Sequence, residues 1–222
     1  MKFEKKHLLW ILAILILLLI IVFIFQTTKN DYIKTKKSNN GSKLPEINLE
    51  SNDGKAINQY LEELYNKYTS DEKSKFTYTY DEKNNIISIL AIIDEYEEDT
   101  QQYIRKYMAF NIDKTTEEYV TKEDLVSLFS TNMYEVKETV ENHFKELYDK
   151  EIEANYIEKK ECDFNCYLSY MRGIEIITDN IVLVIEKNKL VAYTNFDVTY
   201  SDDADYFKNI KENYYRTIIK EL

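Results

Sequence analysis

The longest apolar run in the chain extends over 18 consecutive residues, from Leu8 to Phe25. As a helix, such a run is about 27 Å long, which is close to the hydrocarbon thickness of a lipid bilayer. A cleavable signal peptide has a shorter apolar core, of about 7–15 residues, and small residues at its cleavage site. The residues after Phe25 are Gln-Thr-Thr-Lys, which provide no such site. The pattern predicts a single, uncleaved transmembrane helix over residues 8–26.

Lysine residues flank this helix on both sides, so their number alone does not fix its orientation. Three lysines precede it, and five lie between residues 29 and 43. A short basic leader ahead of an apolar run is typical of a signal anchor, and large domains cross the membrane with little regard to their charge. We therefore expect residues 1–7 to be a cytoplasmic tail. The C-terminal domain is expected to be extracellular, in a single-pass protein of the cell membrane.

Polar residues dominate from position 27 to position 45, with the sequence Ser-Asn-Asn-Gly-Ser at 38–42. A segment of this composition buries little apolar area and does not order itself readily. We interpret residues 27–45 as a flexible stalk, whose lysines could also rest on anionic lipid or on a cell-wall polymer. The folded domain is then expected over residues 46–222.

Apolar side chains recur at helical spacing after the stalk, and Asp53 precedes them as a candidate N-cap. Three strand-like segments follow, at residues 76–80, 86–93 and 103–112, and a polar turn separates the first two. The pattern predicts a helix that packs on a three-stranded antiparallel meander. The apolar residues of this helix are Ile57, Leu61, Leu64, Tyr65 and Tyr68.

Two N-capping patterns begin the second half of the domain. Thr121 with Asp124 precedes a short apolar stretch, and Asn132 with Glu135 precedes a longer helix. Strand-like segments separated by short turns then predict a second antiparallel meander, and helical spacing from Ser201 onward predicts a final helix. The expected strands are residues 174–178, 181–186 and 190–200; the longer helix carries Val136, Val140, Phe144, Leu147 and Tyr148; the final helix carries Phe207, Ile210, Tyr214 and Ile218.

The order of these elements is helix, strands, helices, strands and helix. By the rules of layer packing, this order predicts an α+β fold, with antiparallel sheet meanders packed with helices. The single transmembrane helix precedes this fold. A chain of 222 residues is long enough for one such domain in addition to the membrane segment.

The net charge and the glycine content restrict the classes of function. Of the formal net charge of −11, residues 1–45 contribute +6, which leaves −17 on residues 46–222. An acidic domain lacks the concentrated positive face that phosphate contacts require, so we expect no nucleic-acid partner. With 3 glycines and 1 proline in the chain, a glycine-rich loop that cradles a nucleotide phosphate is excluded, and we expect no cofactor.

Two neighbouring passages resemble a known family. They are Tyr107-Met-Ala-Phe-Asn-Ile-Asp113 and the segment from Tyr119 to Phe129. Together they resemble the strand-turn-helix passage of a family of extracellular domains of unknown function. That family occurs in the lysozyme-sensing anti-sigma factor of Gram-positive bacteria and, as an accessory domain, in membrane-anchored peptidoglycan deacetylases. The Ile57-Asn58 pair and the late hairpin at residues 181–197 extend the resemblance over about residues 45–200.

This resemblance implies a sensing or accessory module of the bacterial cell envelope, for which a cationic protein such as lysozyme is a candidate ligand. The chain departs from the family after Phe196, where the family commonly continues into a segment containing proline and glycine. The seven residues before Leu8 are too few for a cytoplasmic sigma-binding domain. A deacetylase also needs a second domain with metal-binding histidines, which we do not find. We therefore expect neither of those two activities.

The two cysteines of the chain, Cys162 and Cys166, are separated by Asp-Phe-Asn. In an extracellular protein, an even pair this close is typical of a local disulfide. Two independent buried cysteines are a second interpretation, and metal or redox chemistry is a third. Two ligands are too few for a structural zinc ion, and redox pairs usually have two intervening residues.

Other groups have a structural and a functional interpretation each. His143 is expected to be a hydrogen-bonded core histidine rather than a general base, because no motif supplies it with a nucleophile. The acidic runs at 94–99 and 202–205 could bind calcium but lack the pattern of an EF-hand, so solvated charges are expected there. Strand tyrosines could form a platform that stacks on sugars, although packing within a sheet is the commoner role. These tyrosines are Tyr78, Tyr80, Tyr103 and Tyr107.

The sequence leads to one main hypothesis. The protein is expected to be a membrane-anchored extracellular binding module of the cell envelope, without catalytic or metal-binding residues of its own. One alternative is a peptidoglycan-active or accessory cell-wall enzyme, and another is a structural member of a membrane complex. The residues that would bind the ligand are not identified by the sequence.

Overall fold

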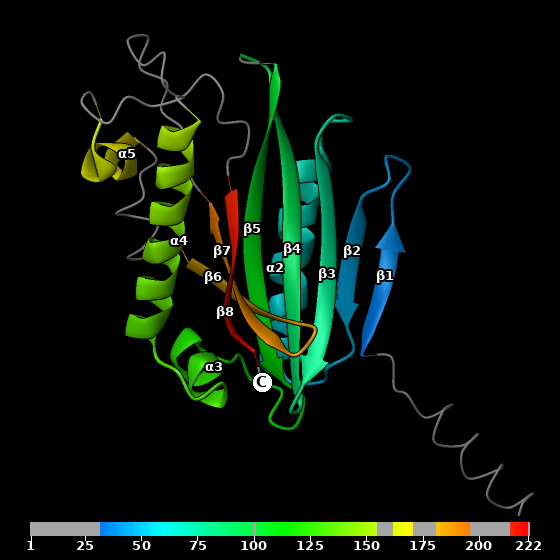
Figure 1. The fold of residues 1–222 in the computed structure, drawn as a ribbon. Coiled ribbons are helices and arrows are strands. Elements are labelled where there is room, and N and C mark those ends of the chain that lie inside the picture. The colour runs from blue at the N-terminus through cyan, green and yellow to red at the C-terminus, as the bar shows by residue number, and fades with distance from the viewer. Residues whose placement is uncertain (1–31, 100, 155–161, 171–180, 196–213, 222) are drawn as a thin grey trace, which may run out of the picture.

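The computed structural model describes residues 32–99, 101–154, 162–170, 181–195 and 214–221 (Figure 1). The expected cytoplasmic tail and the apolar segment 8–26 lie outside these residues. Within them, no helix combines the length and the apolar character needed to cross a membrane. The described part is an α+β fold with antiparallel sheets, which confirms the predicted fold class at that level.

The first sheet has three antiparallel strands: β3 (Lys75–Lys83), β4 (Ile86–Glu97) and β5 (Gln102–Asp113). This sheet is the predicted first meander. Asn84 and Asn85 join β3 to β4 with φ values of 48° and 65°, the left-handed conformations that a two-residue hairpin turn requires. The strands are longer than expected, because Asp94 and Glu95 continue β4 opposite Arg105 and Ile104. Ion pairs of Asp94 with Arg105 and of Glu95 with Lys106 keep part of the acidic run inside the sheet, where solvated charges were expected.

The second sheet is formed by β6 (Ile181–Glu186), β7 (Lys189–Asn195) and β8 (Tyr214–Glu221), again antiparallel and in this order. The hairpin between β6 and β7 confirms the predicted turn at residues 187–188. The prediction of a helix for the end of the chain is wrong for residues 214–221. There Thr217 is buried and Ile219 packs on the core, while Ile218 between them is 40% exposed, as alternation in a strand requires. The predicted strand 174–178 and residues 196–213 lie outside the described residues.

Four helices complete the described fold: α2 (Asn52–Thr69), α3 (Lys122–Leu128), α4 (Met133–Glu153) and α5 (Phe164–Tyr170). Thr121 and Asn132 cap α3 and α4 as predicted, through bonds from the backbone N–H groups of Asp124 and Glu135. The cap of α2 is Ser51, whose hydroxyl accepts a hydrogen bond from the Gly54 N–H over 2.9 Å. The predicted cap, Asp53, lies in the first turn instead.

The interpretation of residues 27–45 as a flexible stalk is wrong for residues 33–45. These residues belong to a β-hairpin of β1 (Ile33–Lys37) and β2 (Lys43–Ile47). The hairpin buries Ile33, Leu44 and Ile47 in the core beside α2, and both Asn58 amide atoms bond to the Ile47 backbone. The lysines on the exposed face of the hairpin give the segment its polar composition, which conceals the few apolar residues on the buried face. The folded domain therefore begins before the predicted boundary at residue 46.

The elements pack in four layers (Figure 1). The helix α2 and the β1–β2 hairpin cover one face of the first sheet, around Leu61, Phe76 and Ile89. The second sheet lies on the opposite face, with Leu90 and Val184 between the sheets. Helices α3, α4 and α5 cover the outer face of the second sheet and enclose the third core cluster. Alternate residues of β6 and β7 thus serve two different cores, as the two-residue period of a strand allows.

A row of polar side chains on the first sheet binds the backbone of strand β6. Asp81, Ser88 and Asn111 lie side by side on β3, β4 and β5, because Ser88 pairs with both of the others. The Asn111 amide donates to the Leu183 carbonyl over 3.0 Å, and the Ser88 hydroxyl accepts from the Ile185 N–H over 2.8 Å. The Asp81 carboxylate accepts from the Lys187 N–H. The row thus satisfies backbone groups of β6, and of the turn that follows it, on the edge that faces away from β7.

Removal of one member of this row is expected to destabilise the whole domain. Asn111→Ala leaves the buried Leu183 carbonyl without its donor and deprives the Ser88 hydroxyl of its acceptor, at 2.6 Å. We expect the free energy of unfolding to fall by about 2–4 kcal/mol, since buried polar groups are left unpaired. Urea denaturation of the full chain in detergent micelles, followed by circular dichroism, measures this change.

The exposed helix residue Asn66 provides a matched control, because Asn66→Ala removes the same side chain at the surface. This control should change the stability by less than about 0.5 kcal/mol. An Asn111→Ala variant as stable as the control would show that the row does not hold the two sheets together.

Candidate functional site

A groove of about 620 Å³ runs along the outer edge of strand β5. Five consecutive residues of β5, from Tyr107 to Asn111, line it. Because neighbouring residues of a strand point to opposite faces, a groove lined by consecutive residues follows the edge of the sheet. Helix α2 forms one wall and the first residues of β6 form the other, so the groove lies between two layers of the fold.

The walls of the groove are mainly apolar. Ala56 and Ile57 line it from α2, and Ile181 and Leu183 line it from β6. Tyr60 is 45% exposed, and its ring lies 6.0 Å from that of Phe110, centroid to centroid. A concave apolar surface with a few polar groups is typical of binding sites in proteins.

The segment before α3 closes one end of the groove. Its Val120 N–H donates to the Asn111 carbonyl over 2.8 Å, and the Asp113 N–H donates to the Glu118 carbonyl over 3.0 Å. Tyr119, between these bonds, forms an isolated antiparallel bridge with Ile112 and is 48% exposed. Partial burial raises the pKa of the Tyr119 hydroxyl above its ordinary value, so this group remains a neutral donor at physiological pH.

Glu117 fixes this segment to the start of helix α2. Its carboxylate accepts hydrogen bonds from the backbone N–H groups of Glu50 and Ser51, and the Ser51 hydroxyl donates to the Glu117 carbonyl over 3.0 Å. Glu117 has a φ of 59°, a left-handed conformation that these bonds hold in place. The closed end of the groove is therefore built from two segments that are distant in the sequence.

The four strand tyrosines do not form one platform. Tyr107 is buried between the sheets, with its ring centroid 4.5 Å from that of Tyr193. Tyr78 and Tyr80 lie on the opposite face of the first sheet, and the Tyr78 hydroxyl shares a hydrogen bond with Thr35 of the hairpin. Tyr103 is 57% exposed at the far end of β5. The structure therefore gives these tyrosines separate packing roles, and it brings only Tyr107 to the groove.

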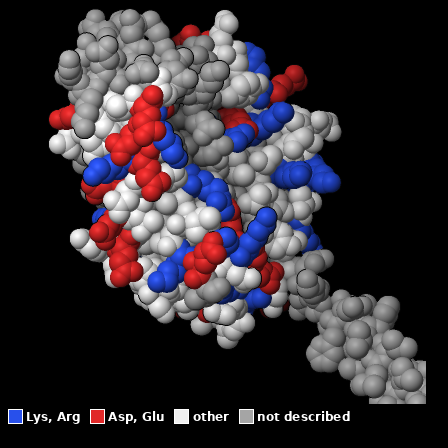
Figure 2. Space-filling view, viewed as in Figure 1, with Lys and Arg blue, Asp and Glu red and all other residues white. Residues whose placement is uncertain are grey.

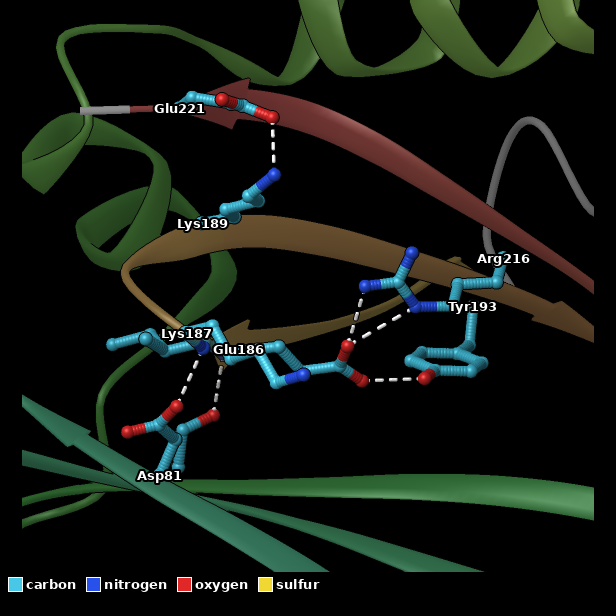
Figure 3. A network of polar contacts seen from close by, with 9 residues as sticks. Asp81, Glu186, Lys187, Lys189, Tyr193, Arg216 and Glu221 are labelled. Carbon is cyan, nitrogen blue, oxygen red and sulfur yellow. Dashed lines mark hydrogen bonds and ion pairs between the residues drawn. The ribbon is translucent and has the colours of Figure 1, made fainter.

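A network of polar side chains ties the strands of the second sheet together (Figure 3). The Arg216 guanidinium donates to one oxygen of Glu186 from Nε and Nη2, over 3.0 and 2.6 Å, and the Tyr193 hydroxyl donates to the other oxygen. Burial, reinforced by the negative charge of Glu186, raises the pKa of Tyr193 far above its ordinary value. Tyr193 thus stays protonated, and the network acts as a structural clamp rather than as an acid–base pair.

Cys162 and Cys166 are joined by a disulfide, with their Cα atoms 5.3 Å apart. This is the first of the three interpretations of the pair. The Cys162 carbonyl accepts a hydrogen bond from the Tyr148 hydroxyl over 2.8 Å, and the Tyr148 ring lies against those of Phe164 and Tyr167. The disulfide thus fixes the start of α5, and the contacts of Tyr148 hold this segment against α4.

His143 lies on α4 and shares a hydrogen bond with the Thr217 hydroxyl of β8, 2.6 Å from its Nδ1 atom. Burial lowers the pKa of the imidazole from its ordinary value of 6.5, and the neighbouring Glu146 and Lys150 act in opposite directions on it. This is the hydrogen-bonded, partly buried histidine that the sequence predicts. It joins the helical layer to the second sheet.

Acidic side chains form no metal-binding cluster within the described residues, where no group of three or more histidine, cysteine or acidic side chains could hold a metal ion. Asp94 and Glu95 are paired with Arg105 and Lys106. The second acidic run, at 202–205, lies outside the described residues.

Comparisons with known proteins add no relative. No protein-family model matches the chain, and neither a curated protein nor a solved structure gives a significant match. The groove at the edge of β5 is therefore the candidate site on its own geometry.

The lowered pKa of His143 predicts a pH dependence of stability. As the pH falls below about 6.5, the unfolded chain binds this proton before the folded chain does, so the stability that neutral His143 contributes is lost. The variant His143→Gln keeps a neutral hydrogen-bonding group and has no such proton. Between about pH 7.5 and pH 5.5, its melting temperature should fall less than that of the wild type.

The control for this measurement is Asn142→Gln, at an exposed position of the same helix. Its melting temperature should follow the wild-type pH dependence. Equal pH dependence in the His143→Gln variant and the wild type would contradict the assignment of a buried, neutral imidazole.

Mass spectrometry tests the disulfide directly. The intact mass of the unfolded, full-length chain should rise by about 2 Da on reduction, and a thiol reagent should not label the chain before reduction. Because the ring closes only five residues, Cys166→Ser should reduce stability by less than a disulfide that closes a long loop. Labelling of both cysteines without reduction would identify them as free thiols.

Proposed function

We propose that the protein is a binding module of the bacterial cell envelope, anchored in the membrane by residues 8–26 and without a catalytic role. The observation that carries this proposal is the groove of about 620 Å³ along β5, with its apolar walls. Tyr60 and Tyr119 lie at this groove and remain about half exposed. Partly exposed aromatic side chains around an apolar groove are enriched at sites where proteins bind partners.

The resemblance to envelope-sensing domains supports the same proposal. The passages that carry it, residues 107–113 and 119–129, supply the floor and the closed end of the groove. The two passages that resemble the sensing modules thus also form part of the candidate site. The predicted transmembrane helix supports an extracellular position for the domain.

The charge of the domain supports a cationic protein as the partner. The domain counted from residue 32, which includes the four lysines of the hairpin, carries a formal net charge of −13. Acidic side chains are exposed along α3 and α4, among them Glu123, Glu138 and Glu141, and red patches follow this side of the molecule in Figure 2. A field of this sign accelerates the approach of a positively charged protein. Lysozyme is the candidate that the family resemblance suggests.

Binding of lysozyme to the full chain in lipid nanodiscs tests this function. We expect an equilibrium binding signal that weakens at least about tenfold between 50 and 300 mM salt, since screening shortens the range of the charges. An anionic protein of similar mass, offered under the same conditions, is the control and should not bind. Absence of binding at both salt concentrations would refute lysozyme as the partner.

Incubation of the same nanodiscs with purified peptidoglycan separates a binding module from a cell-wall enzyme. The proposed module should leave the polymer intact. Release of soluble sugars or peptides would overturn the non-catalytic part of the proposal.

A further inference from the structure

The geometry points to a specific mode of binding, which rests on the proposed function and deepens it. We propose that the groove accepts an extended peptide segment of the partner, which pairs with the outer edge of β5 as a fourth strand of the first sheet. Such strand addition uses backbone hydrogen bonds for affinity and side-chain contacts on either side for selectivity.

The backbone of β5 offers the required groups at this edge. In an antiparallel pair, alternate residues direct their N–H and C=O groups toward the neighbouring strand and the intervening ones direct theirs outward. The bonds made by Asn111 and Asp113 to the segment before α3 show which residues face outward. By the same alternation, Ala109 directs its backbone groups into the groove.

The chain itself already adds a short strand to this edge. Residues 118–120 run antiparallel to β5, and their pairing ends at Asn111. The chain turns away because Thr121 caps helix α3. Among the described strands, only β4 pairs with β5. No described strand therefore continues the pairing of residues 118–120 along the outer edge of β5 beyond Asn111, toward Tyr107. A peptide in the groove would continue this pairing.

The walls of the groove determine which kinds of side chain such a peptide needs. A strand in the plane of the first sheet would direct alternate side chains toward Ala56 and Ile57 on α2, and the others toward Val182, which faces the first sheet from β6. Both walls are apolar at these positions. We therefore infer a short segment that is apolar on both faces and lies opposite Ala109, because the outer edge at Asn111 is already bonded to Val120.

Hydrogen exchange and a panel of peptides test strand addition on the full chain in nanodiscs. The panel consists of blocked heptapeptides with lysine at both ends and five central residues drawn from Val, Ile, Tyr and Ala. We expect fluorescence anisotropy to detect binding of members of the panel. Exchange of the Ala109 amide hydrogen should slow at least about tenfold when the peptide is bound.

Backbone methylation distinguishes strand addition from simple apolar contact. In a bound peptide, N-methylation of the alternate amides that face β5 should weaken binding at least about tenfold, whereas methylation of the intervening amides should have little effect. Equal effects of the two methylation patterns, or unchanged exchange at Ala109 with peptide bound, would overturn the proposal. Failure of every panel member to bind would overturn it as well.

A matched pair of variants places the peptide in the groove. Ala56→Trp fills the groove from an exposed position of α2 and should weaken peptide binding at least about tenfold. Asn66→Trp places the same side chain on another exposed part of the helix and should leave binding unchanged. Equal binding by the two variants would show that the peptide lies elsewhere.

The outcomes for the peptide and for lysozyme are independent. If lysozyme binds and no peptide binds, strand addition is wrong and the proposed function stands. If a peptide protects Ala109 and lysozyme does not bind, strand addition stands and the cationic partner is wrong.

Discussion

The fold depends on how strand β6 is held against the first sheet. A strand at the edge of a sheet carries a row of backbone groups that require partners, and β6 presents that row to another sheet. Asp81, Ser88 and Asn111 supply the partners from three different strands. Ser88 and Asn111 are buried away from water. Their hydrogen bonds therefore both stabilise the contact between the sheets and determine the position of β6. The wall of the groove that β6 forms is positioned by the same contacts.

The sequence predicts most elements of the fold but not the contacts between them. Helices α3 and α4 and the strands of the first sheet were recognisable from capping patterns and alternation. The β1–β2 hairpin was not, because its three apolar residues are dispersed among lysines and polar residues. The last strand was mistaken for a helix because Tyr214 and Ile218 are four residues apart, a spacing that a helix and one face of a strand both allow. Its true environment is set by pairing with β7, which local spacing does not encode.

The candidate groove was not predicted from the sequence either, although some sequence features point to the contacts that form it. Ser88 and Asn111 interrupt apolar strands, and a polar residue at such a position indicates a buried hydrogen bond. Ala56 and Tyr60 lie four residues apart beside the core stripe of α2, which indicates a second apolar contact of that helix. That these residues meet at one edge of the sheet follows from the layering of α2, β5 and β6. The positions of three separate segments in space decide it, and no single segment reveals it.

If residues 8–26 anchor the chain as proposed, the hairpin at the start of the domain limits how the domain can be oriented on the membrane. With the proposed anchor ending at residue 26, the six residues before Ile33 can span at most about 20 Å. This is roughly half the diameter of a domain of this size. Under the proposed anchoring, this short connection restricts rotation of the domain above the bilayer and keeps the hairpin, which directly follows it, close to the membrane. Lys34, Lys36, Lys37 and Lys43 are exposed on that hairpin, so anionic headgroups would attract this side of the domain and turn its acidic helices toward the cell exterior.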